Sequence, residues 1–228
     1  MENIGNEIFT GKVEVISEVK NAMKYNFNHN LETEIKQAKE VAGDLDWYKE
    51  NGYEAILPVG ISRESSDEEI KKAVEKEFSE NEKNFEEIQR EVQKLLSKHS
   101  LKLDSFFSAF EYETPKSIQL FFTAYGSGGG YDLPDKVFVL MSDSIQDIFE
   151  TIIHETVHLI IEKPLITKYN IPHWQKEMLV DILCESSLLD GIYRKNQIQN
   201  DSEHISLDYI EKMKFNRKDT LNYKPFLK

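Results

Sequence analysis

The chain has 228 residues and a mass of 26.6 kDa, with 39% hydrophobic and 30% charged residues. This length favours one domain with a helical extension, and a mean hydropathy of −0.53 with no long apolar stretch argues against a membrane span. A net charge of −13 repels a phosphate backbone, so nucleic acid is not an expected partner. The single cysteine, Cys184, requires no oxidising compartment. The first residues show no signal-peptide pattern, so we expect a cytoplasmic protein if the chain is full length and a secreted one if a signal was removed.

Residues 1–100 predict a helical N-terminal region. One helix is expected from Leu31 to Ala42, and a short piece follows around Trp47. Ser66 and Glu69 have capping-box spacing and predict the start of a long amphipathic helix from Asp67 to Lys98. Apolar residues recur along it at intervals of three, four and seven: Ile70, Val74, Phe78, Phe85, Ile88, Val92, Leu95 and Leu96.

Residues 101–228 have a different pattern, which predicts a second region containing strands. The segments Ser117–Tyr125 and Lys136–Met141 are rich in β-branched and aromatic residues and are typical of strands. Between them lies the glycine run Gly126–Gly130. No Gly-Lys-Ser/Thr follows this run, so we expect a flexible hairpin tip rather than a phosphate-binding loop.

Two apolar helices are expected after the strands. Ser144 predicts an N-cap for a helix that runs from Ile145 to about Glu162 and stops before Pro164. A second helix is expected from about Pro172 to Leu189. The remaining residues are polar, with one more helix expected near Leu207–Phe215.

The first of these helices carries His154, Glu155 and His158 in the HExxH pattern. Histidines four residues apart lie on one face of a helix, so both can present a nitrogen to a single zinc ion. Glu155 is displaced around the helix and can reach a water on that ion without being a ligand. Without a metal, a buried ionisable trio would carry a large desolvation cost, so we predict a metal site.

A catalytic zinc ion needs a third protein ligand and an open fourth position. The metzincin extension is absent, because its glycine would fall at Ile161 and its third histidine at Pro164. Three donors along one straight helix cannot converge on a tetrahedral ion, so we expect the ligand to come from the next helix. The nearby donors are Glu162, His173, Glu177, Asp181 and Glu185.

The motif His154–His158 followed by Glu177, within the local pattern Glu177-Met178-Leu179-Val180-Asp181, resembles the gluzincin metallopeptidases of the thermolysin-like clan. This resemblance covers about residues 117–189. It implies that His154, His158 and Glu177 are zinc ligands and that Glu155 is the general base. It also implies that Asp181 orients His154 without touching the metal.

The expected fold class is therefore α+β and zincin-like, with a small sheet beside an active-site helix and a glutamate helix. Residues 101–228 would form the metallopeptidase domain, with the helical region packed on or beside it. The resemblance also implies a cleft-lining edge strand, for which Lys136–Met141 is the candidate. Gluzincins usually have a tyrosine or histidine that stabilises the oxyanion; no matching motif is visible, and Tyr193, His204 and Tyr209 are candidates by position only.

The expected function is zinc-dependent hydrolysis of peptide bonds, with a peptide or protein as substrate. The alternative is a zincin-like binding or regulatory module without turnover, in which the long N-terminal helix could cover the cleft as a proenzyme segment does. The intact Glu155 argues against the alternative. His173 is expected to be a partly exposed residue at a helix start, and Cys184 a small buried hydrophobe.

Overall fold

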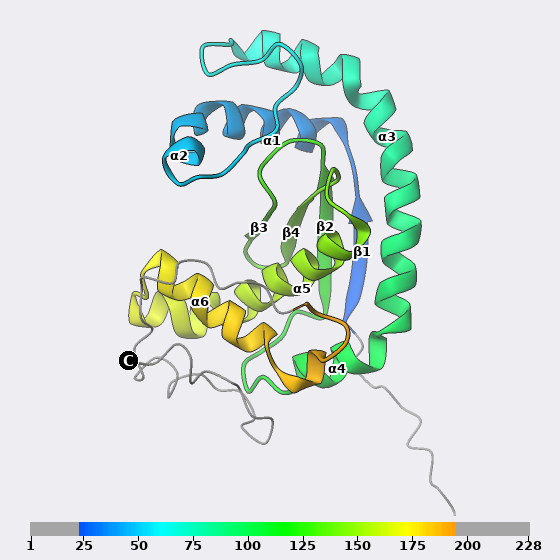
Figure 1. Cartoon of the computed structure of the whole chain (residues 1–228), viewed down its shortest axis with the longest axis vertical. Helices are drawn as coiled ribbons and strands as arrows, with labels where there is room; N and C mark the ends of the chain where they lie inside the picture. The colour runs from blue at the N-terminus through cyan, green and yellow to red at the C-terminus, as the bar shows by residue number, and fades with distance from the viewer. Residues whose placement is uncertain (1–22, 195–228) are drawn as a thin grey trace, which may run out of the picture.

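The computed structural model describes residues 23–194, which form helices packed around a small mixed sheet (Figure 1). This α+β class agrees with the expectation from the sequence. The strands are β1 Lys24–Asn28, β2 Ser117–Thr123, β3 Gly129–Asp132 and β4 Lys136–Leu140. The α-helices are α1 Leu31–Gly43, α2 Leu45–Glu50, α3 Asp67–Lys98, α4 Ser100–Ser108, α5 Ile145–Ile161 and α6 His173–Cys184.

The four strands lie in the order β1-β2-β4-β3. β1 and β4 both run parallel to β2, whereas β3 runs antiparallel to β4. Side chains alternate along β2, so that Ile118, Leu120 and Phe122 are fully buried on one face while the residues between them are partly exposed. One face of the sheet therefore carries the core.

Two expectations about this sheet are wrong. β2 and β4 are parallel neighbours, so the glycine run between them cannot be the tip of a hairpin that joins them. Instead, Gly129 and Gly130 begin β3, which forms the hairpin with β4. The segment Lys136–Met141 is consequently an interior strand, and the edge strand that lies beside α5 is β3.

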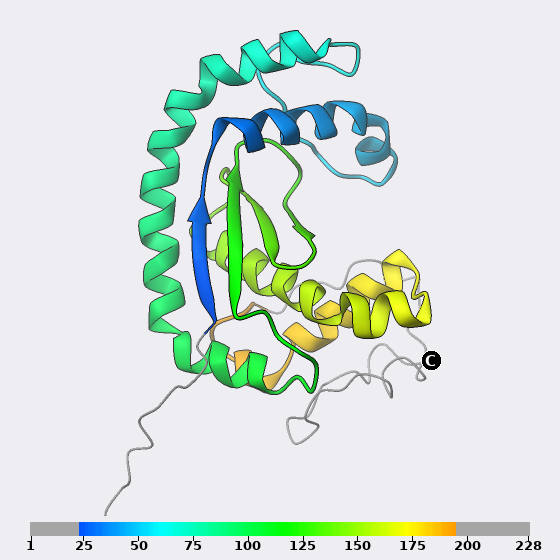
Figure 2. The ribbon, with the colours of Figure 1, turned by 180° about the vertical axis from the view of Figure 1, so that it is seen from behind.

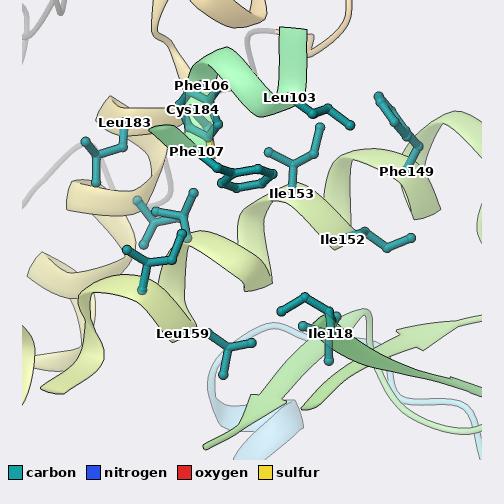
Figure 3. Packing of buried hydrophobic residues seen from close by; sticks show 14 of the residues in the cluster. Leu103, Phe106, Phe107, Ile118, Phe149, Ile152, Ile153, Leu159, Leu183 and Cys184 are labelled. Carbon is teal, nitrogen blue, oxygen red and sulfur yellow. The ribbon is translucent and has the colours of Figure 1, made fainter. Parts of the chain in front are cut away.

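α5 is the central helix of the core. It begins at Ile145, as expected, and ends at Ile161, next to the expected end near Glu162. Figure 3 shows Ile152 and Leu159 on the side of α5 that faces Ile118 of the sheet, and Ile153 on the side that faces α4. Leu183 and Cys184 reach the same core from α6. Because burying one such side chain stabilises a fold by about 1.5–3 kcal/mol, this packing fixes the position of any group carried by α5.

The long N-terminal helix α3 has the predicted bounds and the predicted capping box between Ser66 and Glu69. Both views place it alongside β1 (Figure 1, Figure 2). Its C-terminal half contributes to the main core, and its N-terminal half packs with α1 in a second cluster. The buried residues are Ile88, Val92 and Leu96 in the C-terminal half and Ile70 and Val74 in the N-terminal half.

A buried carboxylate joins α1 to the end of β2. Glu34 is fully buried and accepts hydrogen bonds from the Thr123 hydroxyl at 2.9 Å and from the Ala124 backbone N–H at 3.0 Å. His29 Nε2 lies 2.8 Å from the same carboxylate, and its ring stacks on Phe78. Both carboxyl oxygens of Glu34 thus have partners, as a buried polar group requires.

The helix ends differ from expectation in two places. The chain does not stop before Pro164 but continues as a π-helix over Glu162–Thr167. Proline has no N–H to donate to an α-helical hydrogen bond, and a wider turn tolerates this. α6 ends at Cys184 rather than Leu189, because the Ser186 hydroxyl accepts from the Leu188 N–H and starts a separate 3₁₀ turn. The helix expected near Leu207–Phe215 lies outside the described residues.

The sheet takes strands from both sides of the division expected near residue 100, since β1 pairs with β2. The two-domain division itself stays a prediction. Within residues 23–194, no helix is both long and apolar enough to cross a membrane.

Candidate metal centre

α5 and α6 bring three predicted ligands together. His154 Nε2 and His158 Nε2 lie 3.1 Å apart, and Glu177 Oε2 lies 3.4 Å from the first nitrogen and 3.1 Å from the second. The three side chains are 15%, 2% and 12% exposed, so the cluster is open to solvent mainly on the side of His154 and Glu177. Among the described residues this is the group of side chains that could hold a metal ion.

The donor set suits zinc. Nitrogen and oxygen donors at about 2.0–2.1 Å from a tetrahedral zinc ion lie about 3.3 Å from one another, and the three separations here are 3.1, 3.1 and 3.4 Å. Two imidazoles and one carboxylate leave a fourth position for water or substrate, which is the composition of a catalytic rather than a structural site. His154, His158 and Glu177 would hold the ion.

The electrostatics of the cluster favour positive charge at its centre. Burial acts to lower the pKa of His154, but hydrogen bonds to Cys184 and Glu177 outweigh burial and hold this pKa well above its usual value. Burial likewise acts to raise the pKa of Glu177, yet hydrogen bonds from His154 and His158 hold it well below its usual range. Two nitrogens and a carboxylate facing one another need a proton or a cation between them.

Asp181 lies one turn beyond Glu177 on α6, beside the first histidine. Its Oδ1 is 3.7 Å from His154 Nδ1, which is an ion-pair distance and longer than a hydrogen bond. A hydrogen bond joins the thiol of Cys184 to His154, and burial raises the pKa of this thiol. The expected burial of Cys184 is confirmed at 1% exposure, but its interaction with His154, a candidate ligand, was not expected. The orienting role of Asp181 stays a prediction.

Glu155 is buried beside strand β3 and is 8% exposed. A Cβ atom added to Gly129 would lie only 2.7 Å from Glu155 Oε1 and 2.3 Å from the Thr151 methyl group. The glycine therefore allows the edge strand to approach α5 so closely that the Glu155 carboxylate lies against its backbone. The sequence signal for this close approach was the glycine run itself.

The three candidate ligands and Glu155 line a cleft of about 470 Å³. The edge strand β3 and its preceding loop form part of the lining, which also includes three aromatic residues of the N-terminal region: Trp47, Tyr48 and Tyr53. Trp47 is 45% exposed and stacks on Tyr53 at 5.7 Å. Sequence reasoning missed these three residues. No residue of α3 lines the described cleft, so the idea that the long helix covers it is wrong.

The other singled-out residues lie around the cleft with different partners. Tyr193 lines the cleft, and its hydroxyl is hydrogen-bonded to Cys184. His173 begins α6 with a side chain 48% exposed, as expected, and its Nδ1 is 3.7 Å from Glu177 Oε1. Glu162 accepts a hydrogen bond from Tyr131 and does not join the ligand cluster. Two further oxyanion candidates, His204 and Tyr209, lie outside the described residues.

Comparison with known proteins adds no relative: no family model, no curated protein and no solved structure matches this chain.

Proposed function

We propose that this protein is a zinc-dependent metallopeptidase of the gluzincin type. The observation that carries the proposal is the convergence of two imidazole nitrogens and one carboxylate oxygen within 3.1–3.4 Å of one another, on two helices, at the base of a cleft. Glu155 lies on the same helix as the two histidines and lines the same cleft. The donor types, their separations and the adjacent carboxylate all support hydrolytic zinc chemistry.

Each residue has a distinct task in this proposal. Bound zinc would polarise the scissile carbonyl and activate a water molecule. Glu155 accepts the proton of that water as it attacks and returns the proton to the leaving amine. Asp181 holds His154 in place, and Gly129 keeps the edge strand close enough to confine the Glu155 carboxylate.

The edge strand supports a peptide as the substrate class. In the described part of the chain β3 pairs only with β4, so its other edge has unpaired backbone groups. Gly129, Gly130 and Tyr131 of this strand line the cleft beside the ligands. An extended peptide can add to such an edge through main-chain hydrogen bonds, which holds its carbonyl groups at a fixed height above α5.

The test combines metal analysis with an activity assay. Purified wild-type protein should contain one zinc per chain, and Glu177→Ala should bind zinc far more weakly than Glu185→Ala, a matched change at the end of the same helix. The wild type should cleave denatured casein, and a chelator should abolish cleavage. Equal zinc content in the two variants would remove Glu177 from the ligand set. Zinc binding without any cleavage would favour the alternative, a module without turnover.

A further inference from the structure

Three side chains from three different elements form a connected polar chain beside the ligands. The Tyr131 hydroxyl, on β3, donates to Glu162 Oε2 at 2.6 Å and accepts from Lys176 Nζ, on α6, at 3.2 Å. Lys176 Nζ also lies 3.5 Å from Glu177 Oε1. The chain therefore runs from the end of α5 across the edge strand to a proposed ligand.

Tyr131 also contacts the second histidine. Its ring stacks on the ring of His158, with centroids 4.9 Å apart and planes inclined by 7°. His158 Nδ1 is buried and has no hydrogen-bond partner among the described residues. A metal-binding histidine is usually oriented by a hydrogen bond at its second nitrogen. Because the described residues supply no such bond to His158, its ring is oriented by aromatic contacts: the stacked ring of Tyr131 and the edge of the His154 ring, whose centroid is 4.8 Å away.

Lys176 acts on the other side of the cluster. Glu177 Oε2 faces both histidines, whereas its Oε1 faces Lys176 Nζ at 3.5 Å and His173 Nδ1 at 3.7 Å. The Lys176 side chain is 16% exposed and that of His173 is 48% exposed, so the lysine is the less solvent-screened of the two. A cation at Oε1 favours binding of the carboxylate to a metal through Oε2 alone.

We propose that Tyr131 and Lys176 are positioning residues of the metal centre. Tyr131 holds the ring of His158, Lys176 holds the second oxygen of Glu177, and the hydrogen bond between them couples the two ligands. The inference rests on the proposed zinc site but does not require peptidase activity. It makes the edge strand part of the support of the metal as well as a wall of the cleft.

The experiment measures zinc affinity by competition with a chromogenic chelator and the visible spectrum of the cobalt-substituted protein. Lys176→Met and Tyr131→Leu should each weaken zinc binding by about 10 to 100-fold. Tyr131→Phe keeps the ring and should lose less than Tyr131→Leu, and Lys176→Arg should restore most of the affinity. Lys83→Met, the same change at an exposed position on α3, should bind zinc as the wild type does.

The cobalt spectrum separates positioning from a general loss of structure. In Lys176→Met, Glu177 is free to bind through both oxygens, so the visible absorption should weaken as the coordination number rises. If Tyr131→Leu does not fold, the coupling is tested with Tyr131→Phe and Lys176→Met, singly and combined. The double variant should lose less zinc-binding free energy than the sum of the two single losses. Additive losses, or wild-type affinity and spectrum in Lys176→Met, would overturn the inference. A wild-type protein that binds no zinc would instead overturn the proposed function.

Discussion

Replacing Gly129 with alanine is the sharpest test of how the edge strand and α5 fit together. The added methyl group would lie 2.3 Å from the Thr151 methyl carbon, 2.7 Å from Glu155 Oε1 and 3.0 Å from Glu155 Cγ. Carbon atoms in contact are normally about 3.5–4.0 Å apart, so the first overlap exceeds 1 Å. The backbone at Gly129 is not in the left-handed region, so the effect of the substitution is steric.

The size of the effect follows from which atoms can move. The Glu155 carboxylate can rotate, but Thr151 is β-branched and its rotamers in a helix are restricted, so strand β3 must shift away from α5. Overpacking of this kind costs about 1–3 kcal/mol. We expect Gly129→Ala to lower the free energy of unfolding by that amount and to weaken zinc binding, because Tyr131 and its stack on His158 move with the strand.

The neighbouring glycine provides the control. An alanine at Gly130 would meet no atom within 4 Å, so Gly130→Ala should change stability by less than about 1 kcal/mol in either direction. Urea unfolding of the metal-free proteins measures the difference. Thr151→Ser removes the clashing methyl group and should restore part of the stability of Gly129→Ala in the double variant. Equal unfolding midpoints for Gly129→Ala and Gly130→Ala would refute the close approach.

Three further predictions concern single carboxylates. Glu155→Gln should keep zinc, because Glu155 is not a proposed ligand, and should no longer cleave a peptide library. Cleavage by Glu155→Gln would show that Glu155 is not the general base. Asp181→Asn should bind zinc about 10 to 100-fold more weakly while staying folded. An unchanged zinc affinity would contradict the proposal that Asp181 orients His154. A hydrogen bond from Ser144 and the charge of Arg194 lower the pKa of Asp147, so its stabilisation is present above about pH 4 and is lost as the pH falls. The difference in unfolding free energy between wild type and Asp147→Asn should therefore shrink between about pH 6 and about pH 3, and a pH-independent difference would contradict it.

Helices α3 and α5 could be predicted because their signals are local. The capping box at Ser66, the apolar stripe of α3 and the N-cap at Ser144 all act within one or two helical turns, and the structure confirms each of them. The spacing of His154 and His158 likewise places both nitrogens on one face whatever surrounds the helix. The bounds of α3 and α5 needed no knowledge of the rest of the fold.

The sheet could not be predicted in the same way. β1 has the sequence KYNFN, without β-branched residues, and it is held by pairing with β2, which lies about 90 residues later in the chain. The order of β2, β4 and β3 depends on a crossover that no short pattern encodes. The glycine run predicted a turn from composition alone, whereas Gly129 is needed because α5 lies beside it.

The residues proposed to support the metal centre could not be recognised from the sequence either. Tyr131 and Lys176 belong to no motif, and they contact each other and the candidate ligands from segments far apart in the chain. The one available signal was position: Lys176 directly precedes Glu177, and Tyr131 directly follows the glycines. Adjacency along the chain did not show that their side chains meet.

The buried Glu34 limits where this polypeptide can be cut without loss of the fold. Cutting the polypeptide near residue 100 would separate Glu34 from the Thr123 hydroxyl and the Ala124 N–H, and would remove β1 from its pairing with β2. Loss of the fragment would leave unpaired buried polar groups and an exposed strand edge in the rest of the protein, which favours aggregation. Residues 23–100 therefore belong to the same folding unit as the helices that carry His154 and Glu177 and are unsuited to act as a removable leader.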